Sequence, residues 1–140
     1  MTHIEILDGS DALPFQIPAG RGNHAGVPAS VSKLVAEAKP SQLVAWKDSI
    51  SNTIGFARNT RTIVIDAGSV DGLAICFMRK AKGTGFVSLE AKLQDIPTPL
   101  LLFEIGQFDA PGLQWLSERA GQFEKMFGVP VKIEDYGYDC

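Results

Sequence analysis

The chain has 140 residues, a formal net charge of −3 at pH 7, 45% hydrophobic residues and 21% charged residues. This length matches one ordinary domain, and the apolar content excludes a disordered chain. The longest apolar runs are far shorter than the ~18 residues that a membrane span needs, and the net acidity argues against a general phosphate-binding surface. Residues 1–5 lack the pattern of a secretory signal, so we expect a cytoplasmic protein.

The first part of the chain predicts a short strand, a long loop and two helices. Isoleucines alternate with polar residues over 3–7, and the pattern ends at Asp8. Prolines and glycines then interrupt residues 8–27, which we interpret as a long, mobile or binding loop. Apolar residues at helical spacing follow over 28–38 and again over 41–57, with Pro40 between them. We therefore expect a helical hairpin ahead of the sheet.

Four consecutive strands are expected next, at 63–65, 73–78, 86–93 and 100–105. The second of them is apolar on both alternating faces, as an inner strand is, and we also expect 100–105 to be an inner strand. Turn residues such as Gly83 and Gly85 separate the second and third strands.

The last elements are an amphipathic helix over 109–127 and a strand over 129–133. The helix carries apolar residues spaced by three and four, and Gly128 stands where a left-handed cap belongs. Because a strand–helix–strand connection crosses over right-handedly, the last strand should run parallel to its partner. Residues 134–140 form an acidic tail in this interpretation.

The fold class that follows is α+β, in one domain that spans residues 1–140. It combines the N-terminal helical hairpin, a mixed but mainly antiparallel sheet of four to five strands, the C-terminal helix packed on that sheet, and the last strand. Cys76 alternates within an apolar strand and should be a small core residue, so we expect no disulfide framework.

One group of residues could carry catalysis. Asp71 precedes the second strand, and Glu90 and Lys92 are two residues apart on the third. Two carboxylates and a lysine on adjacent strands suit magnesium-dependent phosphodiester cleavage, in which the acids hold the ion. The order of elements, with an Asp before a Glu-x-Lys, resembles the restriction-endonuclease-like nuclease core. That resemblance implies metal binding by Asp71 and Glu90 and a catalytic role for Lys92. The competing interpretation is that Glu90 and Lys92 belong to the solvent face of an amphipathic strand.

A second group could bind a partner. Trp115 lies off the main helical stripe, and Tyr136 and Tyr138 lie among the acids Glu134 and Asp135. Aromatic residues flanked by acids are typical of protein-binding surfaces and would suit a basic partner. Alternatively, Trp115 widens the buried face of its helix and the acids solvate the terminus.

We therefore expect a small non-enzymatic protein of bacterial or phage type that binds and modulates another macromolecule, as an immunity protein, an inhibitor or an accessory chaperone does. A protein partner is favoured over nucleic acid or a membrane, and a homodimer is left open. No metal or cofactor is expected, since the two histidines, His3 and His24, have no ligand spacing. The alternative is the metal-dependent nuclease, with magnesium as its cofactor.

Overall fold

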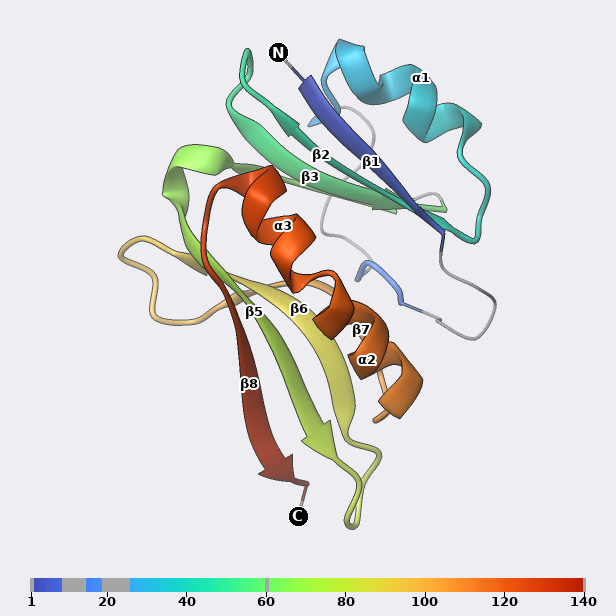
Figure 1. The fold of residues 1–140 in the computed structure, drawn as a ribbon, viewed down its shortest axis with the longest axis vertical. Coiled ribbons are helices and arrows are strands. Elements are labelled where there is room, and N and C mark those ends of the chain that lie inside the picture. Colours follow the sequence, from blue (N-terminus) through green and yellow to red (C-terminus); the bar gives the residue numbers. More distant parts are fainter. Residues whose placement is uncertain (1, 9–14, 19–25, 60, 140) are drawn as a thin grey trace. The chain divides into compact units, whose positions relative to one another are not determined.

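The computed structural model describes residues 2–8, 15–18, 26–59 and 61–139. The chain has an α+β fold, with two four-stranded sheets and three α-helices in the described residues. It divides into two compact units: the first contains residues 2–8, 17–18, 26–59 and 61–69, and the second contains 15–16 and 70–139. Each unit has its own sheet and helical cover (Figure 1). No helix in the described ranges is long and apolar enough to cross a membrane.

The first unit is an antiparallel meander in which neighbouring strands in sequence are neighbours in the sheet. Its strands are β1 (Thr2–Asp8), β2 (Gln42–Asp48), β3 (Thr53–Arg58) and β4 (Arg61–Asp66). The helix α1 (Ala29–Glu37) enters between β1 and β2, and a 3-10 turn, η2 (Ala67–Ser69), ends the unit.

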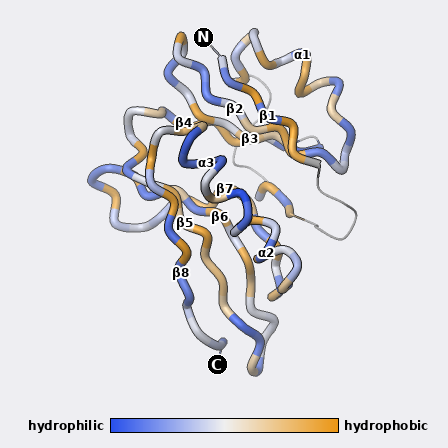
Figure 2. Tube along the Cα trace, in the orientation of Figure 1, coloured by the Kyte–Doolittle hydropathy of each residue, from blue (hydrophilic) through white to orange (hydrophobic). Residues whose placement is uncertain are grey.

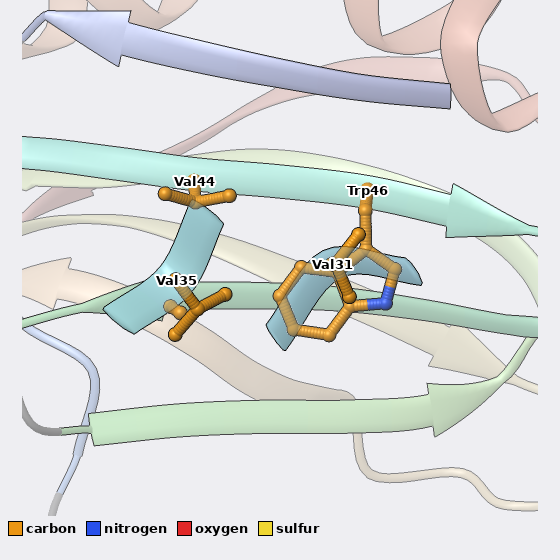
Figure 3. Packing of buried hydrophobic residues seen from close by; sticks show 5 residues of the cluster. Val31, Val35, Val44 and Trp46 are labelled. Carbon is orange, nitrogen blue, oxygen red and sulfur yellow. The ribbon is translucent and has the colours of Figure 1, made fainter. Parts of the chain in front are cut away.

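The helix α1 packs on one face of this sheet. Val31 and Val35, four residues apart and so on one helical face, lie over Val44 and Trp46 of β2 (Figure 3). Ala57 of β3 completes the cluster, in which every member is buried. The helix predicted over 28–38 is confirmed.

The second predicted helix, over 41–57, is wrong, because these residues form the β2–β3 hairpin. The apolar residues at helical spacing included Ile50, but its side chain is 86% exposed in the turn between the two strands. Residues 43–46 are instead buried consecutively, as in a strand that is covered on both faces. Asn52 supplies the left-handed backbone of the turn with φ 55. There is therefore no N-terminal helical hairpin.

The second unit has the strand order β7-β6-β5-β8. Its strands are β5 (Val70–Arg79), β6 (Phe86–Leu93), β7 (Leu100–Ile105) and β8 (Val131–Tyr138). The pairs β5–β6 and β6–β7 are antiparallel, whereas β8 is parallel to β5, as the crossover rule predicts. β5 is an inner strand and is hydrophobic over its middle (Figure 2). The prediction that 100–105 is an inner strand is wrong, since β7 lies at the edge of its sheet. Among the described residues, its one further pairing is a bridge from Gln16 to Glu104.

The predicted helix over 109–127 is two shorter helices, α2 (Ala110–Glu118) and α3 (Ala120–Phe127). They are separated at Arg119, whose backbone leaves the helical region at φ −100 and ψ 0. The helical spacing still describes the buried face, because Leu116 and Phe123 are fully buried. Gly128 adopts the expected left-handed cap with φ 70.

The helices cover the sheet face that carries Ile105. The side chain of this residue would lie 2.6 Å from a Cβ atom on Gly112 of α2. Since Val87 is paired with Ile105 and Phe77 with Val87, these three residues share that face. The opposite face of β5 and β6 carries Cys76 and the residues paired with it. Of the predicted loop over 8–27, residues 9–14 and 19–25 lie outside the described part, and Phe15 and Ile17 are buried.

Candidate binding surface on strand β8

The strand β8 brings most of the predicted partner-binding residues together. Residues 134–138 are not a tail, because they continue the strand and pair with β5, with Glu134 opposite Cys76 and Asp135 opposite Phe77. Both tyrosines of the chain are on this strand, with 43% of Tyr136 and 63% of Tyr138 exposed. We call Ile133, Glu134, Asp135, Tyr136 and Tyr138 the β8 surface.

One end of the β8 surface is organised by Arg79, at the end of β5. Its Nη1 atom donates to both oxygens of Asp135, each at 2.9 Å. The guanidinium carbon lies 5.7 Å from the centre of the Tyr138 ring and 4.9 Å from that of Phe77. The backbone N–H of Gly137, together with Arg79, lowers the pKa of Asp135 below its usual value. Arg79 therefore holds an acid and an aromatic ring in place at the end of the strand.

Glu134 and Tyr136 point to the face of the sheet opposite that of Asp135, because side chains alternate along a strand. Lys92 of β6 donates to Glu134 Oε1 at 2.5 Å, and the Tyr136 hydroxyl donates to Glu134 Oε2 at 3.3 Å. The hydrogen bond from Lys92 lowers the pKa of Glu134, and the same bond raises the pKa of Lys92. The Tyr136 ring meets Phe86 edge to face, with 5.8 Å between ring centres.

Cys76 lies beneath this group and is 1% exposed, as the sequence predicts for a core residue. Burial raises the pKa of its thiol to about 12, so the reactive thiolate is scarce at neutral pH. The hydrogen bond with Cys76, followed by burial, raises the pKa of Tyr136 above its usual value. Tyr136 therefore stays protonated and keeps its donor.

Trp115 is placed apart from these residues, in the packed interior of the second unit. Its side chain is 9% exposed and its ring centre lies 5.5 Å from that of Phe15. The Arg119 guanidinium lies over the ring at 4.0 Å and donates to the Trp115 carbonyl oxygen. Of the two interpretations of Trp115, the geometry fits the wider buried face of the helix.

The three predicted catalytic residues, Asp71, Glu90 and Lys92, do not form one site. Asp71 and Lys92 line a pocket of about 190 Å³, together with Gly72, Leu73, Pro130 and Lys132. Glu90 is not part of that lining, and one of its oxygens accepts a hydrogen bond from Ser88 at 2.8 Å. Lys92 is paired with Glu134 rather than with Glu90. Within the described ranges, no three His, Cys, Asp or Glu residues form a group that could hold a metal ion.

Sequence reasoning missed the role of Asp139, beyond the end of β8. Its Oδ1 accepts backbone N–H groups of Ala81, Lys82 and Gly83, and its Oδ2 accepts that of Gly85. These four donors, the Ala81 N–H foremost, lower the pKa of Asp139. The glycines of the β5–β6 turn were the available signal, but a turn of this kind does not reveal which distant acid it will bind. Asp139 fastens the end of the β8 segment to that turn.

Residues 27–138 match a family model described as the PM0294 C-terminal domain, and the chain belongs to that family. The match covers α1, both sheets except β1, and the whole of the β8 surface. No curated protein and no solved structure matches the chain.

Proposed function

We propose that this member of the PM0294 C-terminal domain family is a small cytoplasmic protein, of bacterial or phage type, that binds and modulates another protein through the β8 surface. Immunity proteins, inhibitors and accessory chaperones act in this way. The observation that carries the proposal is the position of both tyrosines, exposed on an edge strand, with an acid beside each.

The aromatic residues would supply most of the contact area. Tyrosine combines a large apolar ring with a polar end and few rotatable bonds, and it is enriched among residues that dominate binding energy. Tyr136 is supported from the side by Phe86, and Tyr138 by Arg79. Support of this kind reduces the side-chain entropy that binding must remove.

The acids would act on a partner at long range more than through direct ion pairs. Glu134 and Asp135 each have a cation of the same chain as their partner, Lys92 and Arg79 respectively. Their fields are therefore largely compensated at short range, and a basic partner would have to share or displace these cations. The net charge of −3 still favours a basic partner at long range.

Capture from the native host tests the proposal. The wild-type chain, immobilised, should retain a protein that the double variant Tyr136→Ala with Tyr138→Ala does not retain. Ile96→Ala is the matched control, because Ile96 is 53% exposed in the same unit but lies outside the β8 surface. Equal capture by all three chains would remove the β8 surface from the proposal.

The alternative of a magnesium-dependent nuclease keeps one supporting observation. Asp71 and Lys92, which the nuclease resemblance pairs with Glu90, line the same pocket beside Lys132. A carboxylate with two nearby cations could contact a phosphate and an ion. The proposal of a binding protein stands on more of the described geometry, since Glu90 and Lys92 have other partners.

A further inference from the structure

The outer edge of β8 carries backbone groups that have no partner in the described chain. β8 is the last strand of its sheet, and it is parallel to β5. Leu73 of β5 donates to the Pro130 carbonyl oxygen at 2.9 Å, which sets the alternation of hydrogen bonds along the pair. The backbone groups of Lys132 and Glu134 then face β5, and those of residues 131, 133 and 135 face outward.

One of the outward groups is already used. The Val131 N–H donates to Glu124 Oε1 of α3 at 3.0 Å. Within the described residues, the outward N–H groups of Ile133 and Asp135 and the outward carbonyl of Val131 are available. Such an edge is a template for another strand unless the protein blocks it. Proline residues and β-bulges are two features that often block an edge strand. Residues 131–138 contain no proline, and the bulge in the pairing with β5 comes only after Phe77.

We propose that β8 pairs in antiparallel fashion with β8 of a second copy of the chain, about a two-fold axis at Ile133. The Ile133 backbone then exchanges both hydrogen bonds with Ile133 of the second copy. The Asp135 N–H donates to the Val131 carbonyl oxygen of the second copy, and the reverse bond forms by symmetry. This assembly goes beyond the proposed function and does not depend on it.

The charges favour this register over axes at residues 132, 134 and 135. With Ile133 at the axis, Lys132 lies opposite Glu134 of the second copy in a non-hydrogen-bonded pair, where side chains approach most closely. An axis at residue 132 would oppose two lysines, and an axis at residue 134 or 135 would oppose two acids. Since like charges directly opposite each other are unfavourable, the axis at Ile133 is the one of these four that opposes no like charges.

The side chains of the described edge fit this arrangement. Ile133, which is 53% exposed, would be covered by Ile133 of the second copy. Glu134 already accepts from Lys92, and Lys132 of the second copy would approach it from the other side, so that one acid lies between two lysines. Gly137 has a φ of 82, which turns the strand out of the extended conformation and confines the pairing to residues 131–135. The contact is short, so the dimer should be weak and depend on concentration.

Sedimentation velocity on the purified chain tests the assembly, over protein concentrations from about 10 µM to about 1 mM, where a small interface dissociates. The mass should rise toward that of a dimer. Lys132→Glu places four acids at the axis and should weaken association by about tenfold or more. Lys125→Glu makes the same charge change on the exposed side of α3 and should leave association unchanged. A chain that stays monomeric throughout, or a Lys132→Glu variant that associates like the wild type, would overturn the proposal.

Disulfide trapping in a Cys140→Ser background tests the register. In Ile133→Cys the two introduced sulfurs lie on residues whose Cα atoms are about 5.5 Å apart across the axis, within the range for a disulfide. In Val131→Cys the Cα atoms of the two introduced cysteines would be about 14 Å apart, because each faces residue 135 of the other copy, four residues further along the strand. Mild oxidation should link Ile133→Cys chains and not Val131→Cys chains. Equal linkage of both, or linkage of Val131→Cys alone, would exclude the axis at Ile133. Both experiments use the chain alone, so they are independent of whether a protein partner is captured.

Discussion

Gly55 of β3 lies directly opposite Trp46 of β2, and a Cβ atom on Gly55 would stand 2.0 Å from the Cζ2 atom of the indole. Trp46 is completely buried and packs under Val31 of α1 (Figure 3). The glycine therefore provides the space in which the largest side chain of the first unit lies. A glycine inside a strand often marks such a close approach.

Gly55→Ala should destabilise the protein, because the added methyl group meets a rigid ring that has no room to move. Overpacking of this kind costs about 1–3 kcal/mol. The matched control is Gly121→Ala in α3, where a Cβ atom would meet nothing within 4 Å and alanine should stabilise by about 0.5–1 kcal/mol. Urea unfolding of the two variants measures both effects. A Gly55→Ala variant as stable as the wild type would contradict this packing.

A second prediction concerns Asp48, which is 3% exposed at the end of β2. Its carboxylate accepts hydrogen bonds from the side chains of Ser51 and Thr2 and from the Ser51 N–H, at 2.6–3.0 Å. The Ser51 hydroxyl is the largest influence, and these bonds lower the pKa of Asp48 to about 2. The folded protein thus favours the ionised form more than the unfolded chain does.

The stability that Asp48 contributes should therefore be complete above its unfolded pKa of about 3.8 and disappear as the pH falls toward about 2. Unfolding of the wild type and of Asp48→Asn should be compared from pH 7 down to pH 2. We expect the difference between them to be constant near neutrality and to shrink in the acid range. A difference that does not change with pH would show that the Asp48 carboxylate is not held in its ionised form.

Phe123→Ala tests both the core of the second unit and the expectation of one domain. Phe123 is fully buried, so its truncation should cost about 3–5 kcal/mol in denaturant unfolding, whereas Lys125→Ala should stay within about 0.5 kcal/mol.

Trp46 belongs to the first unit, and its fluorescence can be followed in a Trp115→Phe background. If the chain unfolds as a single domain, Phe123→Ala should shift this signal as much as the circular dichroism. A Trp46 transition unaffected by Phe123→Ala would mean two independent domains, and a loss below about 1 kcal/mol would exclude Phe123 from the core.

Much of the second unit could be predicted from the sequence, because its signals are local. A continuous apolar run identified β5, and alternation identified β6. Helical spacing together with Gly128 identified the buried face and the end of the helical segment. The β2–β3 hairpin could not be distinguished from a helix, since Leu43 and Trp46 have helical spacing and a strand that is covered on both faces shows no alternation. The hairpin depends on the pairing of Trp46 with Gly55. This is a contact between two strands, and the spacing of apolar residues along the sequence does not reveal it.

The candidate site was predicted as a set of residues but not as an arrangement. Tyr136, Tyr138 and their neighbouring acids were identified by residue type, yet they were expected in a tail because nothing local continues the strand beyond Ile133. The ion pair from Lys92 to Glu134 joins residues 42 positions apart. It depends on the register of a parallel crossover, which the sequence does not specify. The two interpretations of Trp115 stayed open for a similar reason, because Phe15, which packs on it, comes from a distant segment.

The nuclease alternative predicts cleavage of DNA or RNA with magnesium or manganese, and loss of that cleavage in Glu90→Ala and Lys92→Ala. We expect the wild type to cleave neither substrate, because Glu90 and Lys92 are engaged with Ser88 and Glu134. Incubation of the purified protein with labelled substrates and each metal decides the matter. Metal-dependent cleavage by the wild type that both variants lose would establish the alternative.

The most direct test of the proposed function is the dissociation rate of a captured partner from variants of the β8 surface. Truncation after Ile133 is unsuitable, since it would remove more than half of β8, so single substitutions are required. Tyr136→Ala or Tyr138→Ala should speed dissociation, with a loss of about 2 kcal/mol or more in binding free energy at a residue that dominates the contact. Glu134→Gln and Asp135→Asn should mainly slow association and reduce its dependence on salt. Wild-type dissociation rates in both tyrosine variants, with folding intact, would contradict the assignment of binding to β8.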